Sequence, residues 1–137
     1  MLLNVTSDIY YTGPLKIGNE ATTRNFLMDS GSDVLWVTST ICATCTGTSK
    51  YNPATGGAVA VSPATTHNVT YIDGTNVQGT WYTANVGVSS VSATSMKILV
   101  ATSSNLSSSR PYEGICGLSA KNITHTVATP LPTVLYN

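Results

Sequence analysis

The most informative segment of this chain is Asn25-Phe26-Leu27-Met28-Asp29-Ser30-Gly31-Ser32-Asp33-Val34-Leu35-Trp36-Val37. Its acidic residue Asp29 lies at a tight polar turn between two apolar runs that are typical of buried strands. Gly31 is expected to adopt a backbone conformation closed to other residues and to let a ligand approach the main chain. A carboxylate held on such a turn suits acid–base catalysis on a bound substrate. The best-known chemistry of this kind uses two carboxylates that share one proton, and Asp-Ser/Thr-Gly occurs once in this sequence.

Length and composition narrow the class of protein. The 137 residues fit one domain with a buried core. The formal net charge is zero and 9% of the residues are charged, which argues against nucleic acid as a partner because no basic surface can follow the phosphates. No apolar run approaches the roughly 20 residues of a membrane-spanning helix. Met1-Leu2-Leu3 gives way at once to polar residues, so no signal peptide is predicted and the chain is either cytosolic or begins after processing.

Other features favour the secretory route. The Asn-x-Ser/Thr pattern of N-glycosylation occurs four times, and the pattern also arises by chance in a chain so rich in serine and threonine. Use of these sites therefore stays open. The candidate asparagines are Asn4, Asn68, Asn105 and Asn122.

The cysteines form one close pair, Cys42-Ala43-Thr44-Cys45, and one isolated residue, Cys116. A lone Cys-x-x-Cys is compatible with a disulfide, half of a zinc site or a redox motif. Zinc needs further ligands at matching spacing, which neither Cys116 nor the two histidines supply, so we expect no metal and no cofactor. We favour a small disulfide that closes a surface loop, and we interpret Cys116 as a buried packing thiol.

The rest of the pattern predicts an all-β fold, because short runs rich in Val, Thr, Tyr and Ile alternate with turn residues. Asp73-Gly74 is predicted at the tip of a hairpin, and residues 102–109 are predicted as a polar loop. Short helices are expected near residues 119–124 and after Pro130 or Pro132. Strands are predicted at residues 9–16, 24–28, 34–38, 59–61, 67–72, 79–88 and 95–102.

Several further motifs follow one another along the chain in a definite order. They are Tyr11-Thr12-Gly13-Pro14-Leu15-Lys16-Ile17-Gly18, the Asp29 segment, the Cys42–Cys45 loop, Tyr51-Asn52-Pro53, Tyr71-Ile72-Asp73-Gly74 with Gly79, Pro111-Tyr112-Glu113-Gly114-Ile115-Cys116-Gly117-Leu118, and Thr129-Pro130. In this order the chain resembles the amino-terminal lobe of the pepsin-like aspartic endopeptidases. The resemblance implies an acid protease lobe of closed or partly open β-barrel-like sheets with a flap hairpin and one or two short helices. It also implies that residues 1–137 are one partial domain without the carboxy-terminal lobe.

The resemblance assigns roles to individual residues. Asp29 is the implied catalytic carboxylate, supported by Ser30, which would bond to the matching loop of the other half, and by Gly31, which would lie close to the scissile peptide. Ser32 would donate a hydrogen bond to Asp29. On the flap, the hydroxyl of Tyr71 would be held by the indole of Trp36, and Asp73 beside Gly74 would bind the substrate backbone. The apolar pocket would be lined by Leu27, Leu106, Tyr112 and Ile115.

Several points of the sequence depart from, or add to, this assignment. Ile72 stands where the family has a glycine after the flap tyrosine, so the flap is expected to be stiffer or differently shaped. Glu113 replaces the usual aspartate and is interpreted as structural. Asp33 follows Asp29 by four residues on the same loop, so it is expected to make surface or turn hydrogen bonds rather than to serve as the second acid. His67 and His125 are interpreted as incidental.

The implied function is an aspartic endopeptidase in which one carboxylate activates a water molecule and the other, protonated, donates to the carbonyl oxygen. The second carboxylate would come from a second lobe or a second copy of the chain. The alternative is an inactive peptide-binding or inhibitor-binding module. The implied location is secreted or extracellular, or else an acidic compartment of the vacuolar or lysosomal type.

Overall fold

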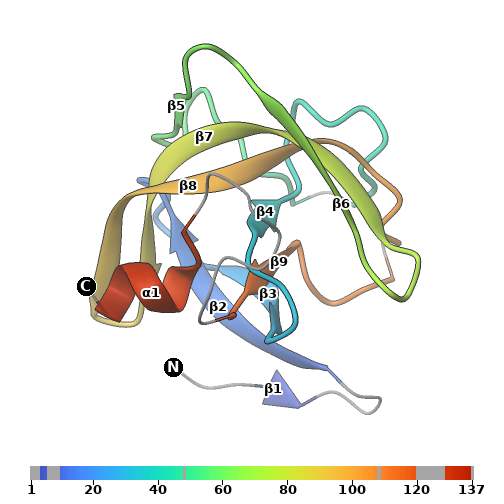
Figure 1. The fold of residues 1–137 in the computed structure, drawn as a ribbon, viewed down its shortest axis with the longest axis horizontal. Coiled ribbons are helices and arrows are strands. Elements are labelled where there is room, and N and C mark those ends of the chain that lie inside the picture. The colour runs from blue at the N-terminus through green and yellow to red at the C-terminus, as the bar shows by residue number, and fades with distance from the viewer. Residues whose placement is uncertain (1–3, 6–9, 48, 108, 120–128, 137) are drawn as a thin grey trace.

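The computed structural model describes residues 4–5, 10–47, 49–107, 109–119 and 129–136. Within these ranges the chain forms nine strands and one short helix (Figure 1). The elements are β1 (Asn4–Val5), β2 (Tyr11–Ile17), β3 (Arg24–Asp29), β4 (Leu35–Val37), β5 (Val59–Ala60), β6 (Thr66–Thr70), β7 (Asn76–Val88), β8 (Val91–Ser104), β9 (Gly114–Gly117) and α1 (Leu131–Tyr136).

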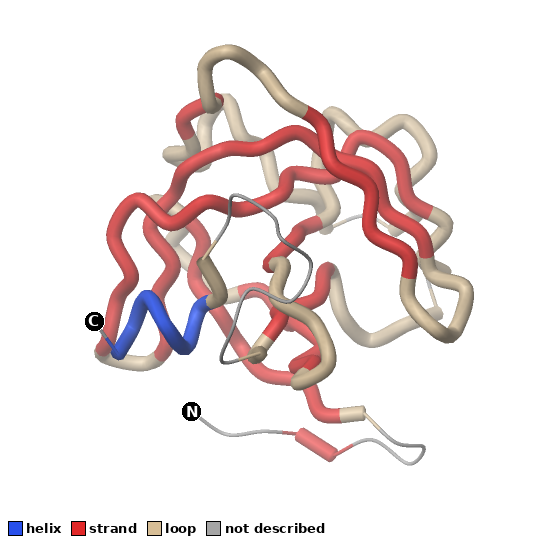
Figure 2. The backbone as a smooth tube through the Cα atoms, viewed as in Figure 1, coloured by secondary structure: helices blue, strands red, loops and turns tan. Residues whose placement is uncertain are grey.

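The sheet closes on itself. Its strands follow the order β2-β3-β9-β4-β8-β7, and the far end of β7 pairs back with β2. Two neighbouring pairs, β3–β9 and β4–β8, are parallel, and the other pairs are antiparallel. Figure 2 shows that the regular structure of the described backbone is almost entirely strand, with α1 on one side. The all-β, barrel-like prediction is therefore confirmed.

The core lies on both faces of the short strand β4. Leu35, Trp36 and Val37 are all buried, and because successive side chains in a strand point to opposite faces they enter two different clusters. Leu35 and Val37 pack with Phe26, Met28 and Leu131, whereas Trp36 packs with Leu99, Ile115 and the cysteine pair. A strand buried on both faces explains the uninterrupted apolar run after Asp29.

All seven predicted strands are present as β2 to β8, with ends displaced by a few residues. The predicted polar loop at 102–109 is wrong at its start, because β8 continues to Ser104, which pairs with Val77 through the main chain. Strands β1 and β9 were not predicted, since each is too short to show a periodic pattern. The helix predicted after Pro130 is confirmed as α1. The helix expected near residues 119–124 falls almost entirely outside the described residues.

No helix in the described part of the chain is both long and apolar enough to cross a membrane.

Candidate active site

Asp29 ends strand β3, and main-chain hydrogen bonds fix its position. The residue pairs with Gly117 of β9, and its carbonyl oxygen accepts the N–H of Leu118 at 2.7 Å. The carboxylate turns back toward its own loop, where Oδ1 accepts the backbone N–H of Gly31 at 3.0 Å. The sheet therefore holds the carboxylate in one place, as the sequence predicts for a reactive group on a rigid turn.

A cleft of about 350 Å³ lies between this carboxylate and the β6–β7 hairpin, which we call the flap. One wall comes from the turn after β3 and the other from the tip of the flap. Ile115 of β9 and Leu27 of β3 supply apolar surface at its base. The lining residues are Leu27, Asp29, Gly31, Ser32, Val69, Thr70, Tyr71, Ile72, Asp73 and Ile115. The structure thus places Asp29 beneath the Tyr71 hairpin, as expected.

The flap ends in a tight turn at the predicted position. The N–H of Gly74 donates to the carbonyl of Tyr71 at 3.0 Å, and the N–H of Tyr71 donates to the carbonyl of Thr75 at 2.8 Å. Gly74 adopts a positive φ of 89°, so the glycine that this three-residue loop needs is Gly74. Ile72 directly follows Tyr71 and occupies the first central position of the turn, whose conformation accepts most residues. Its fully exposed side chain lines the cleft, so the hairpin turn forms with Ile72 in place of glycine.

The flap is joined to the core through Tyr71. The indole Nε1–H of Trp36 donates to the Tyr71 hydroxyl at 2.9 Å, so the predicted hydrogen bond is confirmed. Burial raises the pKa of Tyr71, more than the Trp36 hydrogen bond lowers it. The hydroxyl therefore stays protonated at any working pH and can still donate one hydrogen bond of its own.

The turn residues differ in part from expectation. Ser32 Oγ is buried and makes no hydrogen bond within normal limits to a described residue, so its predicted bond to Asp29 is not present. The hydroxyl faces Tyr71, whose pKa it helps to lower. Asp33 is buried, not on the surface, because the loop packs against Gly117 of β9. Gly31 has no positive φ, and a Cβ there would meet Asp29 Oδ1 at an ordinary 3.4 Å. Ser30 is exposed.

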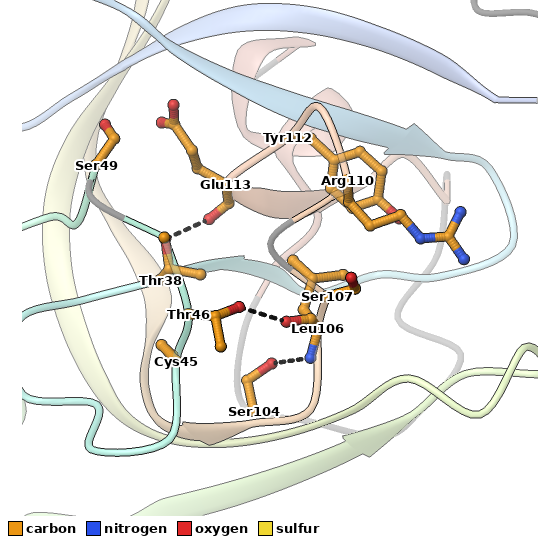
Figure 3. A pocket seen from close by; sticks show the side chains of 11 residues that line it. Thr38, Cys45, Thr46, Ser49, Ser104, Leu106, Ser107, Arg110, Tyr112 and Glu113 are labelled. Carbon is orange, nitrogen blue, oxygen red and sulfur yellow. Dashed lines mark hydrogen bonds between the residues drawn. The ribbon is translucent and has the colours of Figure 1, made fainter.

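The four predicted pocket residues separate into two pairs. Leu27 and Ile115 line the cleft with Asp29. Leu106 and Tyr112 belong to the same apolar cluster as Ile115, but they line a neighbouring cavity of about 200 Å³. Figure 3 shows that second cavity, which is walled by polar side chains from the cysteine loop and from the segment after β8. Leu106 and Tyr112 thus form the layer between cavity and core.

The cysteine pair is a disulfide between Cys42 and Cys45, as favoured from the sequence. It closes a tight loop that packs on the segment after β8. Cys116 is fully buried, and burial raises the pKa of its thiol to about 12, which confirms it as a packing residue. No group of three or more potential metal ligands occurs among the residues that the structure describes.

Charged residues outside the cleft serve the framework. Arg24 forms ion pairs with Glu20 at 2.7 Å and with Glu113 at 3.4 Å, so the interpretation of Glu113 as structural is confirmed. His67 stacks on Trp81 with ring centroids 5.4 Å apart. His125 lies outside the described residues.

The sequons differ in what their side chains do. Asn68 is exposed on β6, and its Oδ1 accepts the side-chain amide of Asn76 at 2.9 Å. Asn105 is exposed too, but both ends of its amide bond to the flap. Asn4 lies in β1. Asn122 lies outside the described residues.

Sequence reasoning missed some residues of the site. Val69, Thr70 and Ile72 line the cleft because the flap bends over it, and only the sheet's curvature reveals this.

At the flap tip, Asp73 Oδ1 accepts the N–H of Thr75 at 2.9 Å. This backbone bond, followed by the Thr75 hydroxyl and then the nearby Arg110, holds the pKa of Asp73 below its usual range. The site therefore has the carboxylate of Asp29, fixed by hydrogen bonds, on one side of an apolar cleft and the ionised, exposed carboxylate of Asp73 on the other.

Comparison with known proteins gives a consistent result. The model of the family described as eukaryotic aspartyl protease matches residues 10–137. The chain is 36% identical over 121 residues to an aspartic protease of Phaffia rhodozyma, covering 86% of this chain and 29% of that protein. It is 34% identical over 133 residues to major aspartyl peptidase 1 of Cryptococcus neoformans, covering 94% and 27%. It is 31% identical over 133 residues to rhizopuspepsin-2 of Rhizopus niveus, covering 94% and 34%.

The chain spans about a third of the length of these curated relatives. The family match covers nearly every residue, including the Asp29 turn, the flap and the β9 segment. With the closed sheet and the carboxylate beneath the flap, this match identifies the chain as a member of the eukaryotic aspartyl protease family.

Proposed function

We propose that this chain forms the amino-terminal lobe of an aspartic endopeptidase and that Asp29 is one of its two catalytic carboxylates. The observation that carries the proposal is the position of Asp29 on the floor of a cleft roofed by the flap. The bond between Tyr71 and Trp36 lets the flap cover a bound peptide while staying attached to the core. A closing flap that excludes water is a recurring device of catalysis.

The proposed mechanism needs a second carboxylate about 3 Å from the first, because two such groups share one proton. The ionised member takes a proton from a water molecule that attacks the peptide carbonyl, and the protonated member donates to the carbonyl oxygen. Asp33 does not suit this role, since it is buried behind the same turn. The second carboxylate therefore comes from a second lobe or from a second copy of the chain.

The proposed substrate is a peptide with apolar residues beside the cleaved bond. Leu27, Ile115 and Val69 give the cleft apolar walls. The exposed carboxylate of Asp73 can accept backbone N–H groups of an extended peptide at the flap tip. Leu106 and Tyr112, which back onto Ile115, are proposed to shape the pocket from behind.

The proposed location is the secretory route, ending outside the cell or in an acidic vacuole-like compartment. The Cys42–Cys45 disulfide agrees with an oxidising compartment. Asn68 is the sequon best placed for a glycan, because it is exposed and its Nδ2 makes no hydrogen bond to the described residues.

Hydrolysis of a denatured protein at about pH 3–5 by the intact protein tests the catalytic proposal, since the shared proton persists in acid. The parent is expected to cleave and Asp29→Asn to lose at least about a hundredfold in kcat. Equal cleavage by both proteins contradicts the assignment. Tight binding of a hydroxyl-bearing transition-state analogue without cleavage would favour the binding module instead. Cleavage by a chain that sediments as a monomer would exclude self-pairing as the source of the second carboxylate.

A further inference from the structure

The segment that follows β8 is hydrogen-bonded to the tip of the flap through one side chain. Asn105 Oδ1 accepts the backbone N–H of Asn76 at 2.7 Å, and Asn105 Nδ2 donates to the carbonyl of Gly74 at 3.0 Å. The backbone N–H of Asn105 also donates to the carbonyl of Asn76 at 3.2 Å. We propose that Asn105 is a positioning residue that clasps the flap in its closed place over Asp29.

Asn105 can restrain the flap only if its own backbone is held in place. The residues on both sides of it are fixed by contacts with the core and the disulfide loop. Leu106 is buried in the cluster that contains Trp36. The hydroxyl of Thr46 donates to the carbonyl of Leu106 at 3.1 Å, and the N–H of Leu106 donates to Ser104 Oγ at 3.1 Å (Figure 3). Asn105 therefore projects from a loop that the core already holds.

The disulfide loop supplies the second anchor. The hydroxyl of Thr44, between Cys42 and Cys45, accepts the N–H of Ser104 at 2.9 Å and lies 3.2 Å from its carbonyl oxygen. A continuous set of contacts thus runs from the disulfide through Ser104 and Asn105 to Gly74. This gives the disulfide loop a role at the cleft, although it lies outside it.

The chemistry of asparagine fits the task. One short side chain must offer an acceptor to Asn76 and a donor to Gly74, and an amide offers both without a charge. Asp73 and Arg110 line the small hollow beside it, together with Asn105 itself. An uncharged clasp keeps its hydrogen bonds in acid, where the proposed dyad operates. The catalytic consequence of the clasp rests on the proposed function, whereas the clasp itself does not.

Hydrogen exchange in the full chain tests the clasp without catalysis. Two protons report on it: the backbone N–H of Asn76, which Asn105 binds, and the indole N–H of Trp36, which Asn105 does not touch and which donates to Tyr71 of the flap. In Asn105→Ala both are expected to exchange about tenfold faster, because the flap loses two of the hydrogen bonds that hold it in place. The amides of Leu99 and Val100 in β8 are expected to keep the parent rate.

Asn68→Ala is the matched control. It also removes an exposed sequon asparagine, one that lies on the flap itself. Asn68 bonds the side chain of Asn76 and not its backbone, so both reporter protons are expected to keep the parent rate. Asn105→Asp is a half rescue, since its carboxyl still accepts the N–H of Asn76 but, when ionised, cannot donate to Gly74. It should slow the exchange of the Asn76 N–H below the rate in the alanine variant.

An unchanged Trp36 indole proton in Asn105→Ala overturns the proposal, because the flap would then stay closed without the clasp. If β8 amides accelerate too, Asn105→Asp decides: slower exchange of the Asn76 N–H than in the alanine variant supports the clasp, and no slowing overturns it. The rates do not depend on hydrolysis, so a clasp that fails leaves the catalytic assignment of Asp29 intact, and the reverse also holds.

Discussion

The hydroxyl of Tyr71 links the flap to the core. It accepts a hydrogen bond from an indole that is completely buried, so Trp36 depends on the flap for its polar partner. A buried donor without a partner costs more than the net value of the hydrogen bond it loses. The flap and the core are therefore coupled in free energy through one oxygen atom.

Tyr71→Phe is expected to lower the free energy of unfolding by about 1–3 kcal/mol, because the Trp36 N–H would be left without a partner. Urea denaturation of parent and variant measures this difference. Tyr112→Phe is the control, since its hydroxyl makes no hydrogen bond to a described residue, and no loss beyond about 0.5 kcal/mol is expected. Equal stability of all three proteins would show that Trp36 finds another acceptor.

The residues of the site that the sequence could predict are those whose partners lie in the same short motif. Asp29 on its turn and Gly74 at the flap tip follow from local pattern. Asn105 could not be found this way, because its partners Gly74 and Asn76 lie about 30 residues earlier. The resemblance did predict the Trp36–Tyr71 bond across 35 residues, but it also placed Ser32 on Asp29, where the structure has no such bond.

Strand β9 shows why short elements escape prediction. Its sequence Gly-Ile-Cys-Gly has no periodic pattern, yet it lies at the centre of the sheet between β3 and β4. Both glycines are required by close approach of the neighbouring backbone. A Cβ at Gly114 would clash with the carbonyl oxygen of Trp36 and lie 2.8 Å from Phe26 Cε1. The strand exists because its neighbours leave room for a bare backbone, which only the assembled sheet reveals.

Gly114→Ala is expected to destabilise the chain by at least about 3 kcal/mol, because the added methyl group overpacks the contact between β9 and β4. Thermal unfolding followed by circular dichroism measures the loss.

Gly87→Ala is the matched control. It also substitutes a strand glycine, in β7, but the new Cβ would meet Lys16 Cβ at an ordinary 3.4 Å. This variant is expected to change the free energy of unfolding by less than about 1 kcal/mol. Any gain in stability would come from the lower conformational entropy of the unfolded chain. Similar losses in both variants would contradict the packing argument at Gly114.

Strands β4, β7 and β8 were predictable because burial on one or two faces imprints a pattern on the sequence. Strand β4 shows as an apolar run, β7 as alternation for much of its length, and β8 as the buried apolar run at residues 98–101. Their ends were not predictable. Polar residues such as Ser103 and Ser104 continue β8 through main-chain pairing with β7, which carries no side-chain signal.

Charge is scarce in this molecule, with six acidic and six basic residues, so a single partly buried cluster has weight. Arg24 lies between Glu20 and Glu113 and over the ring of Tyr51, whose pKa burial raises to about 12. Burial also raises the pKa of Glu113, more than Arg24 lowers it. The net effect of the fold on Glu113 therefore favours its protonated form.

The sign of the pH dependence follows from that direction. A carboxyl whose folded pKa lies above its unfolded value contributes stability that is fully present below the unfolded pKa and is lost as pH rises through the folded pKa. Glu113 thus favours the folded state in acid. Asp73 acts in the opposite sense, because its lowered pKa contributes stability that is lost as pH falls through the folded value. Asp73 is exposed, so solvent screening keeps its effect small.

Glu113→Gln tests this balance over the whole molecule. Glutamine keeps an acceptor for Arg24 but cannot ionise, so parent and variant are expected to differ least near about pH 3 and progressively more toward pH 7. The parent should lose up to about 1 kcal/mol relative to the variant across that range, since the group is partly exposed. Urea midpoints at a series of pH values measure the difference. If the variant instead falls behind the parent as pH rises, attraction to Arg24 outweighs burial, and the cluster would favour a neutral rather than an acidic working pH.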